Sequence, residues 1–181
     1  YIDTRAMFNS FIPAAVPDDL ADKLVNLYLN RLEQEPHLHD RVEFEIAITC
    51  LTFDFQSQVK PLEDIGISPH EIKVFRDALY NITDSATKRR SKDRALLSVL
   101  NERYSNIMQS SAAPVDRAFM LLEDCKQFGT LPFAHMARTA FIAVALLKSL
   151  ESKGISTIEQ TTAFLEHVPT VATQLETDAA L

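Results

Sequence analysis

Apolar residues recur at helical spacing along most of this 181-residue chain, and this periodicity limits its fold more than any other feature. Several apolar runs follow a helix start signal. Pro17 precedes the acidic residue Asp18, and the tetrapeptide that runs from Ser68 through Pro69 to Glu71 combines an N-cap serine, a first-turn proline and a third-position glutamate. The sequence therefore predicts a mainly α fold with seven or so helices.

The predicted helices are separated by prolines, glycines and one basic turn. That turn is the run from Lys88 to Lys92, and a second break is expected at Gly129–Pro132. Gly154 is expected to end the most apolar helix in the C′ position. That helix is expected to be buried along the face that carries Phe141, Val144 and Ala145. The expected helices cover residues 17–35, a stretch from 68 past 82, 91–109, a stretch from 114 to the break, 133–153, 156–167 and a last stretch from 169.

One segment instead alternates apolar and polar residues with a period of two. Val42, Phe44, Ile46, Ile48 and Cys50 alternate with more polar neighbours, which predicts a half-buried strand over residues 41–51. Residues 1–12 are expected to form a short strand or extended arm that pairs with it, since a strand needs a neighbour. The expected fold is an irregular helical bundle with a small two-stranded β element.

The length and the first residue bear on domain organisation. A chain of 181 residues suffices for one domain with a proper core, so residues 1–181 are expected to form a single helical domain. The chain begins at Tyr1 without a methionine, in sequence that already looks structured. We therefore expect a fragment of a larger multidomain protein; a processed mature protein is the less natural alternative. Asp3 and Arg5 interrupt any signal peptide at the N-terminus, and the expected location is the cytoplasm.

Composition argues against several classes of partner. The net charge of −7 repels nucleic acid and anionic lipid at long range, so neither is an expected partner. The longest apolar stretch, residues 137–150, is interrupted by Arg138 and Lys148 and falls short of a membrane span. Cys50 and Cys125 are too few for a disulfide framework or a zinc site, and both are expected to be buried thiols.

Three polar clusters are candidates for chemistry, each with a plainer explanation. His37 and His39 near carboxylates suggest a metal site weakly, and a solvated loop explains them better. The basic run at residues 88–94 could bind phosphate, but a solvated turn is favoured. His135 and Arg138 share a face near a helix start, where an anion or an internal carboxylate would suit them equally.

Three segments together resemble the middle region of phosphoenolpyruvate-synthase-like phosphotransferases, a group that also includes bacterial glutamine kinases of capsule biosynthesis. The segments are YIDTRAMFNSFIP at residues 1–13, HDRVEFEI at 39–46 and GTLPFAHMARTAFIAV at 129–144. The resemblance implies a middle domain between an ATP-grasp domain and a swivelling phosphohistidine domain, with ATP and Mg²⁺ bound elsewhere in the full-length protein. The chain lacks a glycine-rich ATP loop, and Phe133 and Ala134 replace the Thr-Ser that precedes the family's phosphohistidine. His135 is therefore not expected to carry phosphate, and the isolated domain is expected to be inactive.

Two functions follow from these observations. In the first, the domain helps to bind the phosphate acceptor or braces the moving domains of the phosphotransferase. Its acceptor site would then gather seven residues around one cleft: Asp3, Arg5, Ser10, His39, Thr130, His135 and Arg138. In the second, the chain is a structural or protein-interaction domain without a ligand site. No catalytic residue, metal ligand or cofactor of its own is expected in either case.

Overall fold

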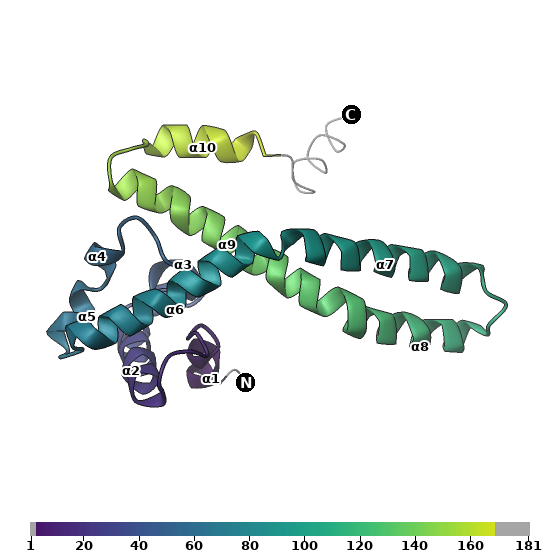
Figure 1. The fold of residues 1–181 in the computed structure, drawn as a ribbon, viewed down its shortest axis with the longest axis horizontal. Coiled ribbons are helices and arrows are strands. Elements are labelled where there is room, and N and C mark those ends of the chain that lie inside the picture. The colour runs from purple at the N-terminus through teal and green to yellow at the C-terminus, as the bar shows by residue number, and fades with distance from the viewer. Residues whose placement is uncertain (1–2, 169–181) are drawn as a thin grey trace.

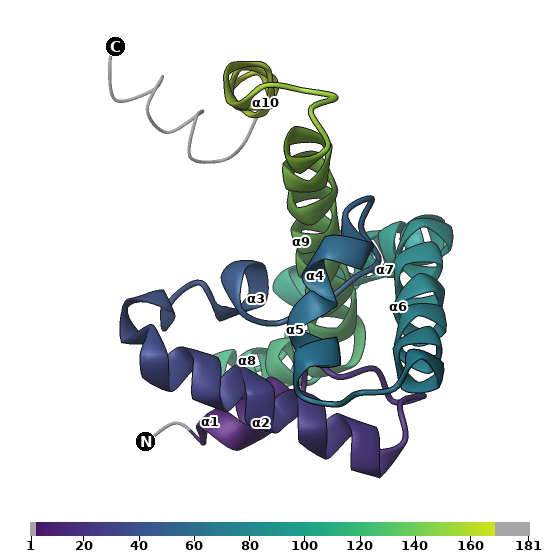
Figure 2. The same ribbon diagram turned by 90° about the vertical axis from the view of Figure 1, so that its left-hand side faces the viewer.

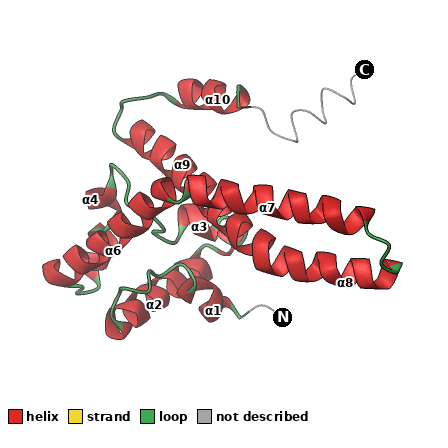
Figure 3. Cartoon of the chain, turned by 45° about the vertical axis from the view of Figure 1, so that its right-hand side comes forward, coloured by secondary structure: helices red, strands yellow, loops and turns green. Residues whose placement is uncertain are grey.

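A computed structural model describes residues 3–168 of the chain, and helices account for almost all of its regular structure (Figures 1 and 3). The mainly α prediction is confirmed, whereas no strand forms among the described residues. The α-helices are α1 (Thr4–Asn9), α2 (Asp18–Gln34), α3 (Val42–Glu45), α4 (Phe55–Gln58), α5 (Lys60–Asp64), α6 (Pro69–Lys88), α7 (Arg90–Gln109), α8 (Pro114–Asp124), α9 (Thr130–Ser152) and α10 (Ile158–Glu166). A 3-10 turn, η1 (Pro36–Leu38), and a π-helical segment, η2 (Cys125–Gly129), complete the set.

The predicted two-stranded β element is wrong in both of its parts. Within residues 1–12, Thr4–Asn9 form α1, whose N-cap Asp3 accepts a hydrogen bond from the backbone of Ala6 at 3.0 Å, and a turn follows. Residues 42–45 form α3, and a loop follows. The period-two pattern misled because it also contains residues four apart: Val42, Ile46 and Cys50 are the members that are buried.

Helices α1 to α6 form a compact body around one apolar core (Figure 2). Phe8 of α1 packs on Tyr28 of α2, with ring centroids 5.7 Å apart, and both side chains are almost fully buried. Leu79 and Phe75 bring α6 into the same core. The capping box predicted at the start of α6 is confirmed, with Ser68 and Glu71 each bonding the other's backbone.

Two long helical rods leave the body side by side and form an arm. Helices α6 and α7 follow one another with only Arg89 between them, and α8 continues through η2 into α9 (Figure 1). The backbone bonds from Arg89 to Ser85 (3.1 Å) and from Asp93 to Arg89 (3.0 Å) carry the helical ladder across the junction. The basic turn predicted at residues 88–92 is therefore wrong, because the chain does not reverse there. We call residues 90–129, which comprise α7, the connecting loop, α8 and η2, the arm.

The break predicted at Gly129–Pro132 is also wrong, since η2 joins α8 to α9 without interruption. Gly129 has a helical φ of −101° and serves close packing instead. A Cβ atom placed on Gly129 would lie 3.3 Å from Leu100 Cδ2 of α7, a tighter approach than side chains normally tolerate. Pro132 lies directly after the π-helical segment η2, so the helix meets the residue that lacks an N–H group where its regular α-helical hydrogen bonding is already interrupted.

Helix α9 connects the arm with the body, but its buried face differs from the expected one. We expected Phe141, Val144 and Ala145 to form that face, whereas the buried residues of α9 are Pro132, Ile142 and Ser149. Phe141 is 36% exposed and packs edge-on against Phe44 of α3. The face is offset because α9 crosses the body rather than passing through its centre.

The C-terminal elements agree closely with the prediction. Gly154 has a φ of +67° and ends the long helix as expected. Helix α10 is capped by Thr157 and not by Ser156, one residue later than predicted. The last predicted helix, from Pro169, lies outside the described residues.

The continuous helix from Pro114 to Ser152 is long and apolar enough to cross a membrane by length and composition. The charged residues Arg138 and Lys148 interrupt its apolar sequence, and only 11% of its most apolar window is buried in the protein. Its C-terminal half nevertheless packs on α3, α6 and α10. These contacts favour a helix that belongs to the body and its arm.

Candidate functional site

The seven residues predicted to line a cleft lie on three separate stretches of the chain. Asp3, Arg5 and Ser10 belong to α1 or its ends, His39 follows η1, and Thr130, His135 and Arg138 lie on α9. Most of their side chains bond within their own stretch. Asp3 caps α1, and Ser10 donates its hydroxyl proton to the carbonyl of Met7 at 2.6 Å.

His39 and Thr130 also make local contacts and stand exposed. Nδ1 of His39 lies 3.2 Å from the carbonyl oxygen of Pro36, within the 3-10 turn. Thr130 donates its hydroxyl proton to the carbonyl of Cys125 at 3.1 Å, across the π-helical segment. Both side chains therefore stabilise their own local turns.

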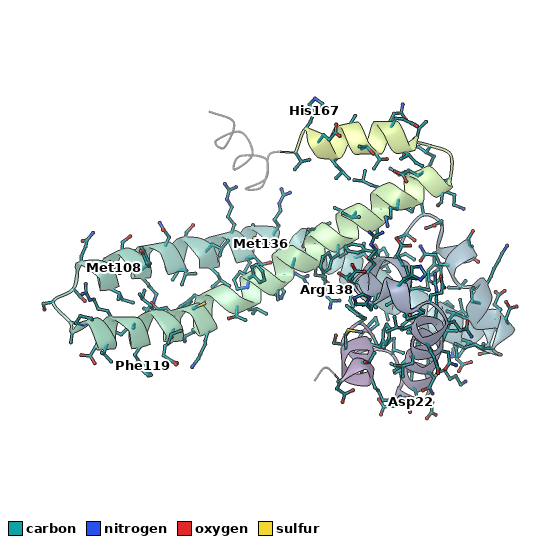
Figure 4. The ribbon with its side chains drawn as sticks, turned by 180° about the vertical axis from the view of Figure 1, so that it is seen from behind. Asp22, Met108, Phe119, Met136, Arg138 and His167 are labelled. Atoms are coloured by element: carbon teal, nitrogen blue, oxygen red, sulfur yellow. The ribbon has the colours of Figure 1, made fainter. Side chains whose placement is uncertain are left out.

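Arg5 turns towards α2 and not towards α9. Its guanidinium group hydrogen-bonds the side chain of Asn26 and lies 3.8 Å from the carboxylate of Asp22. All three residues are exposed, and Figure 4 shows Asp22 on the body, well away from Arg138 on α9. The structure thus gives Arg5 and Arg138 different neighbours.

Arg138 lines a small cavity of about 110 Å³ between α9 and the body. Its other walls are apolar or small, with Phe11, Phe141 and Thr49 among them, and none of the other six predicted residues contributes. No hydrogen bond or ion pair joins its guanidinium group to another side chain between residues 3 and 168. A cavity of this size holds several water molecules, but Arg138 is its only charged group, and an acceptor site needs several convergent polar groups.

His135 takes part in the only contact between one of the seven and a buried charge within residues 3–168. Its Nδ1 lies 2.8 Å from Oδ1 of Asp93 on α7, and Asp93 is 5% exposed. Arg89 approaches the other carboxylate oxygen, with Nε 3.8 Å from Oδ2. The cluster joins α7 to α9 where the arm leaves the body.

The contact with Asp93 indicates which ring nitrogen of His135 carries a proton. A carboxylate only accepts hydrogen bonds, so Nδ1 of His135 carries a proton and donates it to Asp93. Two buried nitrogens of Arg89, Nε and Nη2, have no hydrogen-bond partner within the described part of the chain. The carboxylate of Asp93 contacts the side chains of His135 and Arg89. The cluster therefore holds α9 against α7.

A second polar tie holds the two helices of the arm to each other. Arg103 of α7 binds Asp124 of α8 with two bonds, Nε to Oδ2 at 2.8 Å and Nη2 to Oδ1 at 2.7 Å. The guanidinium carbon also lies 5.1 Å from the ring centroid of Phe128. Hydrogen bonding to Asp124 raises the pKa of Arg103 above its usual value, so the guanidinium group stays charged.

A cavity of about 370 Å³ in the body lies beside α2, α3 and α5. Two of its three charged lining residues form ion pairs, Arg31 with Glu35 at 3.3 Å and Glu45 with Lys148 at 2.8 Å. The third, Glu43, forms no ion pair within residues 3–168. Burial raises the pKa of the Cys50 thiol at its edge to about 11, which leaves almost no thiolate at neutral pH. Among the described residues, the cavity offers no activated nucleophile.

Metal binding and thiol chemistry find little support in the described residues. No three His, Cys, Asp or Glu side chains between residues 3 and 168 lie close enough together to hold a metal ion. Cys125 is exposed on η2, which corrects the expectation that both thiols are buried. It lies beside Leu121 and Leu100 in a shallow groove of the arm.

Asp93, Arg103 and Asp124 are the residues that sequence reasoning misses. Asp93 stands within the basic run that looks like a solvated turn, and only its contact with a residue 42 positions away shows its role. Arg103 and Asp124 are 21 residues apart, on helices whose pairing is a tertiary feature.

No known family model, characterised protein or solved structure matches this chain.

Proposed function

We propose that this chain is a bracing domain, a rigid helical spacer that holds neighbouring domains of a phosphotransferase at a set distance. The observation that carries the proposal is the arrangement of the seven predicted residues. Six of them bond among α1, α2 and η1 or among α7, η2 and α9, and none of these six lines the cavity beside Arg138. An acceptor site requires convergent polar groups around one hollow, whereas a brace requires rigidity.

The length of the two rods and the contacts between them support this role. The helix from Pro114 to Ser152 runs for 39 residues, and the α6–α7 rod lies against it. At 1.5 Å per residue the longer rod spans roughly 58 Å. Two ties, Asp93 with His135 and Arg103 with Asp124, fix the rods to each other.

The phosphotransferase context rests on the resemblance of three sequence segments to the middle region of phosphoenolpyruvate-synthase-like enzymes. In that setting the partners are an ATP-grasp domain and a phosphohistidine domain of the same longer chain, in the cytoplasm. ATP and Mg²⁺ bind to those domains and not to this one. A protein-interaction domain outside any enzyme is the second candidate, and the exposed apolar side chains of the arm favour it.

Kinetics of the longer enzyme separate bracing from acceptor binding. Ser10→Ala and Thr130→Ala each remove an exposed hydroxyl that bonds only a local carbonyl. Bracing predicts an unchanged KM for the acceptor in both variants. A tenfold rise in KM with an unchanged melting temperature, about 1.4 kcal/mol of binding, would overturn bracing in favour of acceptor binding.

A second measurement tests whether this chain performs any part of the chemistry alone. The isolated chain is incubated with γ-labelled ATP and then examined for released phosphate and for acid-labile phosphohistidine. Neither is expected, because no glycine-rich loop is present in the sequence. Stoichiometric label on His135 would refute the proposal, and the His135→Gln variant is the control for that position.

A further inference from the structure

The arm has an unusually thin core for a pair of helices. The structure describes every residue of the arm. Ile107 is the only one among them with a buried apolar side chain, because buried Gly129 has no side chain. The larger apolar residues of α8 instead face solvent: Val115 is 79% exposed, Phe119 65% and Leu122 63%. A monomer leaves such side chains exposed together only where something else covers them.

These three residues form one continuous face. They are four and three positions apart, a spacing that puts side chains on the same side of a helix. Leu121 and Asp124 point towards α7 from the opposite side of α8. Figure 4 shows Phe119 on the side of α8 that is turned away from α7. We call Val115, Phe119 and Leu122 the outer face of α8.

The outer face has a carboxylate at one end and an ion pair, which supplies its only cation, at the other. Exposed Asp116 adjoins Val115 at one end. Lys126 lies one turn beyond Leu122 at the other end, is 71% exposed, and contacts Glu123 at 2.5 Å. When two outer faces meet in antiparallel fashion, each end with a cation therefore meets an end with a carboxylate.

We propose that the outer face of α8 binds the same face of a second copy of this chain, with the two helices antiparallel. Phe119 of each copy then packs on Leu122 of the other, and the stem of Lys126 covers Val115. The ammonium group of Lys126 lies between Glu123 of its own chain and Asp116 of the second copy. A twofold axis through the middle of α8 generates this closed, self-complementary contact.

The distribution of charge favours contact through the arms. The arm contains six basic and five acidic residues, whereas residues 3–89 contain nine basic and fifteen acidic residues. Two bodies repel each other, and two arms hardly do. Antiparallel arms place the bodies at opposite ends of the dimer, where their repulsion is weakest. The contact is one helix wide and smaller than the ~1,200 Å² of a standard interface, so the dimer is weak and depends on concentration.

Other occupants fit the outer face less well. Nucleic acid needs cations, and the face has two carboxylates, Asp116 and Glu123, beside the single cation Lys126. An anionic membrane is disfavoured for the same reason. The proposal does not depend on the bracing function, because a spacer can be monomeric and a dimer can exist outside an enzyme.

Sedimentation velocity of the purified chain over a range of concentrations, up to the millimolar range, tests the proposal. The wild type is expected to show a monomer–dimer equilibrium. Phe119→Asp should raise the dimer dissociation constant at least about tenfold, since an interface anchor is lost. Phe53→Asp is the matched control, because Phe53 is 59% exposed but lies on the body, and its dissociation constant should equal that of the wild type.

Charge exchange tests the antiparallel orientation. Lys126→Glu should weaken the dimer, because three carboxylates then face one another. Adding Asp116→Lys to the same chain should restore it. Parallel helices would not bring the two positions together, so a double variant no stronger than Lys126→Glu would refute the proposed orientation.

Three results would overturn the proposal as a whole. The first is a protein that stays monomeric at every concentration. The second is an equal change in the dimer dissociation constant for Phe119→Asp and Phe53→Asp. The third is binding of anionic vesicles or DNA through the outer face of α8 while the protein stays monomeric. If circular dichroism shows that Phe119→Asp is unfolded, Val115→Asp takes its place, since Val115 lies near the tip of the arm and is 79% exposed. Val115→Asp that leaves the dimer intact would count against the contact.

Discussion

Replacement of His135 by alanine should destabilise the fold, because it removes the hydrogen bond that holds α9 to the buried carboxylate of Asp93. The lost bond is 2.8 Å long and involves a charged acceptor, a class worth about 1.5–3 kcal/mol. His135 is 27% exposed, so water reaches the vacated site and reduces the loss. Asp93 remains buried with Arg89 at 3.8 Å as its nearest partner, which raises the loss again. We therefore expect a decrease of about 2–3 kcal/mol in the free energy of unfolding.

Urea denaturation followed by circular dichroism at 222 nm measures this change, and thermal melting provides a second readout. For a chain of this length 2–3 kcal/mol corresponds to a decrease of roughly 4–12 °C in Tm. His39→Ala is the matched control: its imidazole is exposed, bonds only the carbonyl of Pro36, and should change stability by less than about 0.5 kcal/mol. A double-mutant cycle with Asp93→Asn should give a coupling energy of about 0.5–3 kcal/mol. Equal small effects of His135→Ala and His39→Ala would refute the idea that this pair fastens the arm to the body.

Three further predictions concern other parts of the molecule. Cys125 is exposed and should react promptly with a disulfide reagent at pH 8, whereas Cys50, whose pKa burial raises to about 11, should react only after denaturation; two fast thiols would contradict this. Phe75→Ala should cost about 3–5 kcal/mol, because Phe75 is 1% exposed, and Phe141→Ala clearly less, because Phe141 is 36% exposed; urea denaturation that ranked them the other way would place α9 in the core. The pKa of Glu71 is lowered to about 2 by its hydrogen bonds, so its stabilising effect is complete above pH 4.5 and disappears as the pH falls towards 2; Glu71→Gln should flatten the stability profile over that range.

Local signals are sufficient where the structure depends on neighbouring residues. The capping box at Ser68 and Glu71, the acidic first turn at Asp18 and the left-handed glycine at Gly154 are all confirmed. In each case one or two side chains or a single backbone angle satisfy the helix end within one turn. Such features can be predicted from the sequence alone because no distant residue takes part.

Signals with two local interpretations are resolved only by tertiary contacts. Gly129 and Pro132 are compatible with a break, but Leu100 lies so close to Gly129 that a Cβ atom there would be only 3.3 Å away, so the glycine serves packing. The alternation from Val42 to Cys50 is compatible with a strand, but no partner strand exists in the described residues. The backbone N–H of Ile48 instead finds an acceptor in the hydroxyl of Tyr28, at 3.2 Å.

The candidate site is less predictable than the fold. The sequence points to His135 as a residue near an anion, with an internal carboxylate among the alternatives. The identity of that carboxylate cannot be predicted from the sequence, because Asp93 stands among five cations and looks solvated. Its burial results from the crossing of α7 and α9, which no local pattern encodes.

The polar ties explain how the arm can be ordered while its apolar residues face outwards. Arg103 binds Asp124 with two hydrogen bonds, and Asp93 binds His135, so the helices are held together without a large apolar seam. The outer face of α8 is therefore available to a partner at a geometry that is already fixed. A surface ordered in advance loses little conformational entropy when it binds, and this saving lets a contact only one helix wide be specific. The same fixed geometry suits a brace, because a spacer transmits position only if its own shape does not change.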